Sequence, residues 1–385
     1  MTTLSNKRYK QLDMLKGFAA IMVAIGHLAF MADAHRLYYR WIFQYHMPVF
    51  FWCAGFCFSV REGETPFVPY LWKKVKRLLV PGWLFRTATA AIFVYRQASQ
   101  GAAISFLQTL PSYLYHYSVE WFLPSLFLGY MALYVFYRLY KRIGMLSVVP
   151  ACVLVAFVPF LCAQYDAVIG RETLYLPFLP DSTLIGFSIM QIGFLSRRAL
   201  PHIQQYLAER KPLLKTAGFR LGLAGLVIIV LLLWYRYTSR PEYPYVNIAH
   251  GAFGESDLLY FFFAVFWVLG LTGVFTWMMR TRGFKTVSNM LALGGGTYSL
   301  PIYLLHIVVN DVWAEIFVRI TQRAWNYWEY SVPVRLVYCA ANLAAVFLLI
   351  FLWNRIKKGI REGIGHGRIS RTADRRKQRD RQSNG

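Results

Sequence analysis

The sequence predicts an all-α fold, a polytopic membrane protein with about ten transmembrane helices and both chain ends in the cytoplasm. Of the 385 residues, 57% are hydrophobic and only 16% are charged, which is not the composition of a soluble domain. The mean hydropathy is positive, at +0.38. Apolar stretches of membrane-spanning length recur along the chain, and basic residues gather in alternate connecting segments.

The individual spans follow from length, because a transmembrane helix needs about 20 mostly apolar residues. The stretches that satisfy this requirement are 12–31, 42–60, 78–96, 121–140, 145–163, 182–196, 219–237, 258–279, 295–316 and 334–353. The sixth stretch is short, and the ninth begins in a triple glycine at 294–296 and contains Pro301. Those two spans have the least definite boundaries.

The distribution of Lys and Arg predicts the orientation, since cytoplasmic segments carry an excess of both. With a cytoplasmic N-terminus, 31 of the 42 basic residues fall in inside segments and nine in outside loops. The net charge of +24 is therefore mainly a topology signal, and we expect no nucleic-acid partner. Residues 1–353 form one predicted membrane domain, and residues 354–385 form a basic cytoplasmic tail that is predicted to be disordered.

The first span carries Lys16 and His27, two ionisable residues that a membrane helix should not contain. They are eleven residues apart, which returns both side chains to nearly one helix face with about 16 Å of depth between them. An ionisable residue at the centre of a membrane helix costs about 2.5 to 3.5 kcal/mol or more. Such residues face a protein interior or a water-filled cavity, so this face is the leading candidate for a functional site.

The second span brings a second histidine towards the same depth. His46 lies within about a turn of the predicted outer boundary, near the level expected for His27, and Pro48 follows it. A histidine in a membrane is as compatible with packing as with catalysis, but two at matched depth favour function. We therefore take His27, His46 and Lys16 as candidate catalytic residues.

The inside segment after the second span is basic and includes Lys73, Lys74 and Arg77. Lys74 and Arg77 are three residues apart, so on a helical extension they would share a face and could bind phosphates. The alternative is that the cluster only fixes topology. Spacing alone does not separate these interpretations.

Polar residues also occur in the fourth and ninth spans. Glu120 and Trp121 lie at the start of the fourth span. A carboxylate at this boundary is compatible with simple solvation, and an indole suits the membrane interface. His306 and Asn310 lie one turn apart in the ninth and form either a buried polar network or part of a cavity lining. These four are candidate substrate-binding residues.

Several kinds of chemistry lack their required motifs. The sequence has no nucleophile elbow, no Walker loop and no zinc-binding His-Glu motif, and its five cysteines have no metal-ligand spacing, so we expect no metal. Histidine-centred chemistry in a membrane cavity remains, because a neutral imidazole can take a proton from an alcohol and a basic mouth can hold an anionic carrier.

Four segments in this order resemble the membrane acyltransferase-3 family, especially its fucose 4-O-acetylase-like branch: LDMLKGFAAIMVAIGH, HMPVFFWCAGF, WFLPSLF and YSLPIYLLH. The resemblance spans residues 8 to about 353. A motif of this family consists of a basic residue, ten intervening residues and a His. Lys16 and His27 occupy the two ends of this motif. The family's basic pair, often Arg-x-x-Arg, corresponds to Lys74 and Arg77. Lys74 keeps the positive charge of the first Arg but cannot form its bidentate hydrogen bonds.

The resemblance implies ten helices in a bacterial cytoplasmic (inner) membrane, an acyl-CoA donor, acetyl-CoA above all, on the cytoplasmic side, and O-acylation of an envelope glycan hydroxyl on the far side. It implies that Lys74 and Arg77, with Lys73 beside them, contact the CoA phosphates. His27 would act either as a general base or through an acetyl-imidazole intermediate. The partners would be acyl-CoA, a glycan or lipid-linked saccharide, and the lipid bilayer, with no permanently bound cofactor.

Two alternatives of other classes remain at this point. Intramembrane His, Lys and broken helices also mark the pathways of proton-coupled transporters or permeases of small anionic or sugar-like substrates. The sequence shows no repeat symmetry that would favour a transporter. The other alternative is a membrane scaffold without chemistry, in which His27 would be dispensable.

Overall fold

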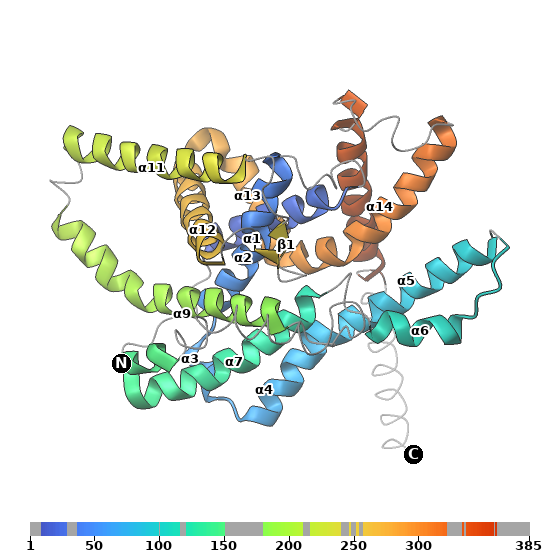
Figure 1. The fold of residues 1–385 in the computed structure, drawn as a ribbon, viewed down its shortest axis with the longest axis horizontal. Helices are drawn as coiled ribbons and strands as arrows, with labels where there is room; N and C mark the ends of the chain where they lie inside the picture. Colours follow the sequence, from blue (N-terminus) through green and yellow to red (C-terminus); the bar gives the residue numbers. More distant parts are fainter. Residues whose placement is uncertain are drawn as a thin grey trace, which may run out of the picture. The chain divides into compact units, whose positions relative to one another are not determined.

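The computed structural model confirms the helical class (Figure 1). The structure describes residues 9–28, 37–99, 101–115, 121–150, 180–210, 216–239, 246–247, 252–253, 257–321, 333–334, 336–357 and 359. Most of these residues are helical, and they also include a pair of two-residue antiparallel strands, β1 (Val246–Asn247) and β2 (Ala252–Phe253). The chain forms two compact units, Met1–Ser299 and Leu300–Gly385.

The first unit is built around two helices, α1 (Lys10–Gly26) and α2 (Leu37–Phe56), which pack against each other. α2 also packs against α9 (Pro180–Glu209) and α12 (Asp257–Arg280), and α7 (Phe122–Ile143) covers another side of α9. Fully buried side chains such as Met14, Leu15, Tyr45 and Phe51 show that α1 and α2 supply much of this core.

Shorter elements complete the first unit. After α2 come α3 (Val60–Glu64) and α4 (Phe67–Lys74), and α4 continues through the π-helical turn η2 (Val75–Leu79) into α5 (Val80–Ser99). The others are α6 (Phe106–Tyr115), η3 (Gly144–Ser147), α11 (Ala217–Thr238), η5 (Arg282–Phe284), α13 (Lys285–Leu293) and the π-helical turn η6 (Gly294–Tyr298). The triple glycine thus belongs to a helical segment that leads into α14 (Ser299–Thr321).

Glycine lets the backbones of this unit touch. A methyl group on Gly17 of α1 would overlap the carbonyl oxygen of Leu291, and one on Gly295 of η6 would overlap the carbonyl oxygen of Asp13. Gly55 of α2 meets the backbone of Met190 on α9 in the same way. Small residues at helix contacts allow this close approach in membrane proteins. The sequence around Lys16 is therefore held by direct backbone packing on α13 and η6.

The second unit contains most of α14 and the helix Leu336–Lys357. Tyr338 of the second helix is buried and donates hydrogen bonds to Asn310 on α14, at 3.0 Å to its carbonyl oxygen and 2.9 Å to Oδ1. Many other side chains on Leu336–Lys357 are apolar and exposed, among them Leu348, Leu352 and Trp353, which suits a surface that faces lipid.

Within the described residues, six helices are long and apolar enough to cross a membrane. They are Phe67–Ser99, Phe122–Pro150, Leu221–Thr238, Leu259–Arg280, Arg282–Trp313 and Leu336–Lys357. The chain is therefore a multi-pass membrane protein, but the expected count of ten is not confirmed. The expected span 145–163 runs beyond residue 150 and lies largely outside the described residues.

Three more expected spans do form helices, α1, α2 and α9, although none meets the length and hydropathy of the six. The physical reason is visible in α2, which buries Arg40, Gln44 and His46. A helix surrounded by other helices can carry polar groups that a lipid-facing helix cannot.

Candidate functional site

His27 is the first residue after α1 and lies exposed at the end of that helix. Its Nδ1 donates a hydrogen bond to the carbonyl oxygen of Val23, one turn earlier, at 2.8 Å. A carbonyl oxygen can only accept, so the neutral ring carries its proton on Nδ1 and keeps a lone pair on Nε2. The side chain is therefore held in the form that can accept a proton.

His46 lies beside His27, as the matched depth predicted. The two ring centroids are 6.5 Å apart, and the ring of Phe43 is next to both. His46 is 2% exposed and donates from Nδ1 to the carbonyl oxygen of Ile42 at 2.6 Å. The second imidazole is thus held in the same tautomer as the first.

His27 lies at the C-terminal end of α1. The C-terminal end of a helix carries partial negative charge, which stabilises a nearby imidazolium by about 0.3 to 1 kcal/mol at an exposed site. A second charge on His46, close by, would be opposed by repulsion. The pair can therefore hold one extra proton at a time, which suits general base catalysis at a hydroxyl.

Lys16 is paired within its own helix. Its Nζ lies 2.9 Å from Oδ1 of Asp13, one turn earlier, and the pair is partly buried. Asp13 was not among the candidate residues, although the spacing of three residues could have identified it as a partner. α1 is an unbroken helix from Lys10 to Gly26, so the predicted separation between Lys16 and His27 of about 16 Å along its axis holds.

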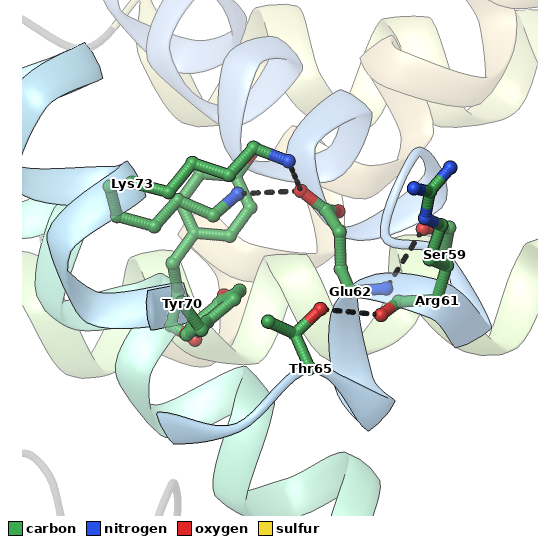
Figure 2. A network of polar contacts seen from close by, with 8 residues as sticks. Ser59, Arg61, Glu62, Thr65, Tyr70 and Lys73 are labelled. Carbon is green, nitrogen blue, oxygen red and sulfur yellow. Dashed lines mark hydrogen bonds and ion pairs between the residues drawn. The ribbon is translucent and has the colours of Figure 1, made fainter. Parts of the chain in front are cut away.

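Lys74 is buried rather than open to the solvent. Its Nζ lies 3.2 Å from Oε1 of Glu62 and 3.4 Å from the ring centroid of Tyr130, and the residue is 3% exposed. The hydroxyl of Tyr70 donates to the carbonyl oxygen of Tyr130 at 3.0 Å, which ties α4 to α7. Figure 2 shows the Glu62 carboxylate with its dashed contacts to Lys73 and Lys74.

Lys73 and Arg77 are both exposed, whereas Lys74 is buried, so Lys74 and Arg77 differ in their access to solvent. The reason is the π-helical turn η2, which begins directly after Lys74 and contains Arg77. A π-helical turn is wider than an α-helical one and changes the side-chain phase. The cluster therefore offers two exposed cations and one buried cation that is already paired.

The other sequence candidates lie elsewhere. Trp121 precedes α7 and is buried against Phe122, so it packs in the interior instead of standing at an interface. Glu120 lies outside the described residues. His306 and Asn310 are both buried in the second unit, and Nδ1 of His306 donates to the carbonyl oxygen of Tyr303 at 2.5 Å.

Sequence reasoning missed several further buried or partly buried polar groups in the first unit. Among them are Glu62 and Arg197 of α9, which donates from an Nη atom to the carbonyl oxygen of Phe56 at 3.2 Å. That bond satisfies the carbonyl end of α2. Cys57, just after α2, lies within electrostatic range of Lys16, Arg197 and Glu62, so these groups belong to one region.

No group of three or more His, Cys, Asp or Glu side chains that could hold a metal ion occurs in the described part of the chain. The cysteines described there are free thiols: Cys53, Cys57 and Cys339.

The fold and the site define the class of this protein. It is a multi-pass helical membrane protein with a pair of oriented histidines, one directly after α1 and one on α2, and a basic cluster on a neighbouring helix. The chain belongs to the acyltransferase-3 family, because residues 9–354 match the family's model, which is described as an acyltransferase domain. No curated protein and no solved structure matches the chain.

Proposed function

We propose that this protein is a membrane O-acyltransferase of a bacterial cytoplasmic membrane. It transfers an acetyl or similarly short acyl group from cytoplasmic acyl-CoA to a hydroxyl group of an envelope glycan on the opposite side. Family membership supports an acyltransferase. The observation that carries the assignment to these residues is the histidine pair, in which both rings donate from Nδ1 to a backbone carbonyl.

In the proposed reaction, Nε2 of His27 removes the proton from the acceptor hydroxyl. The hydroxyl oxygen attacks the thioester carbonyl, the new ester bond forms, and the carbon–sulfur bond breaks. The CoA thiolate leaves and receives the proton from the imidazolium. The rival form of the mechanism passes the acyl group first to Nε2 of His27 and then to the hydroxyl.

The remaining candidates take supporting roles in this proposal. Lys73, Lys74 and Arg77 lie on the donor side, where exposed cations can contact CoA phosphates. Lys16, with Asp13, lies on α1 between the donor side and His27. Glu120, Trp121, His306 and Asn310 are proposed as substrate-binding residues, and their roles rest on the family-like motifs around them.

Mass spectrometry of envelope glycans provides the test. Glycans from cells that lack the protein are compared with glycans from cells that produce the wild-type chain, His27→Ala or the matched control His202→Ala, which changes an exposed histidine of α9. We expect the acyl ester with the wild-type chain and His202→Ala only. An ester that persists with His27→Ala would refute the assignment.

A transporter makes a different prediction, because it moves substrate without consuming acyl-CoA. We expect purified protein in lipid nanodiscs to release free CoA thiol in proportion to acylated acceptor. Intact-mass analysis after rapid quenching, in the absence of acceptor, separates the two chemical mechanisms. A wild-type chain heavier by one acyl group, with no such species for His27→Ala, indicates the acyl-imidazole form.

A further inference from the structure

The Glu62 carboxylate occupies the position that an anionic ligand of the basic cluster would take. Its Oε1 lies 3.2 Å from Nζ of Lys74 and 3.9 Å from Nζ of Lys73. The two lysines come from the last turn of α4, and the carboxylate comes from the separate short helix α3 (Figure 2). Two cations that converge on one carboxylate form a ready anion site.

The three side chains of this site differ in their exposure to solvent. The side chain of Lys73 is 61% exposed, that of Glu62 is 19% exposed, and that of Lys74 is 3% exposed. An anion that arrives from the solvent therefore meets Lys73 first, and it reaches Lys74 only where the carboxylate now lies. Arg77, exposed on the following π-helical turn, adds a third cation nearby in sequence.

The helix that carries Glu62 is fixed, although the glutamate side chain can turn. Ser59 accepts from the backbone N–H of Glu62 at 3.2 Å as the N-cap of α3, and Tyr134 donates to the carbonyl oxygen of Thr65 at 2.9 Å. Gly63 leaves no space for a methyl group against the ring of Tyr137. Displacing the carboxylate therefore needs rotation about the glutamate χ angles and no movement of α3.

We infer that Glu62 is an internal counter-anion that fills the donor-phosphate site of the empty protein and is displaced when acyl-CoA binds. This inference rests on the proposed function. A phosphate carries up to two negative charges and three acceptor oxygens, so it can replace one carboxylate on two lysines and still engage Arg77. In the empty protein, Glu62 keeps the buried ammonium of Lys74 paired, because an unpaired buried charge is costly.

The test measures binding of CoA and of acetyl-CoA to the full-length protein in nanodiscs at low ionic strength. Glu62→Gln removes the competing charge and is expected to tighten binding about three- to tenfold, the effect of removing one competing hydrogen bond of ordinary strength. Glu64→Gln is the matched control, since Glu64 lies on the same helix but pairs with exposed Lys141 at 2.8 Å. This control is expected to bind CoA like the wild-type chain.

Two more variants secure the interpretation. Glu62→Asp withdraws the carboxylate by one methylene group while keeping its charge, and a smaller gain in the same direction is expected. Lys74→Gln should weaken binding, and adding Glu62→Gln to it should restore much less affinity than Glu62→Gln gains alone, because the two residues act on one site. Size-exclusion chromatography verifies that each variant is folded.

The outcomes are distinct. Unchanged or weaker binding by both folded Glu62 variants would overturn the inference and leave the proposed function standing, since Glu62 would then only position Lys74. Failure of the wild-type chain to bind CoA or acetyl-CoA would overturn the donor assignment together with the inference.

Discussion

The contact between α1 and the segment formed by α13 and η6 makes a sharp prediction for Gly17→Ala. The added methyl group would overlap the carbonyl oxygen of Leu291 and would lie 2.9 Å from the backbone nitrogen of Gly295. Both obstacles are backbone atoms, so no side chain can rotate away. Overpacking that forces backbone to shift costs about 1 to 3 kcal/mol, which for a chain of this size corresponds to a loss of about 1 to 4 °C in Tm.

The shift would also affect the site, because Lys16 precedes Gly17 directly. The hydrogen bond from Lys10 to Oδ1 of Asn289, at 2.6 Å, spans the same contact and would lengthen. We therefore expect Gly17→Ala to lower both Tm and acyl transfer.

Thermal unfolding of the purified protein in nanodiscs, with transfer measured on the same samples, tests this prediction. Gly270→Ala is the matched control, since a methyl group there meets nothing within 4 Å. Alanine is also a better helix former than glycine, by about 1 kcal/mol, so this control should not lose stability. A Gly17→Ala protein with wild-type Tm and activity would refute the close-packing argument.

Two further predictions concern the second unit and α3. Tyr338→Phe removes the two hydrogen bonds to Asn310 inside the second unit and should destabilise that unit by about 1 to 3 kcal/mol. The control Tyr235→Phe changes an exposed tyrosine and should be near neutral in the same thermal assay. Equal Tm values for the two variants would contradict the hydrogen-bond assignment. Lys141 donates to Glu64 and lowers the pKa of that carboxyl below 4.5, so the pair stabilises the fold above that pH and loses its effect as the pH falls through the lowered value. A Tm difference between wild type and Glu64→Gln, small because the pair is exposed, should therefore shrink on acidification, and one that grows would contradict this sign.

Helix periodicity was sufficient to predict the histidine pair. His27 lies near the end of the first apolar stretch and His46 near the start of the second, so their depths could be matched by counting residues, and the rings do lie next to each other. The hydropathy pattern likewise located the helices. It overstated the uniformity of the spans, because α1, α2 and α9 exchange apolar surface for buried polar groups that only tertiary packing can accommodate.

The basic cluster could not be resolved in the same way. The Glu62–Lys74 pair joins residues twelve apart across a chain reversal, and no local pattern specifies that the short helix α3 folds back onto α4. The π-helical turn after Lys74 also changes the phase that α-helical counting assumes, and Arg77 is exposed whereas Lys74 is buried. The Asp13–Lys16 pair, by contrast, could have been predicted from the sequence, because residues three apart on a helix share a face.

The rigid attachment of α1 constrains where motion can occur during the proposed transfer. The N-terminal half of this 17-residue helix, which is about 26 Å long, is fastened by glycine-mediated backbone contact, and His27 follows its C-terminal end. Such a helix acts as a strut of fixed length, so its histidine cannot travel to a donor held at the basic end. In the proposed reaction the reach must come from the donor, whose long flexible thiol arm would extend along α1 while its phosphates stay anchored.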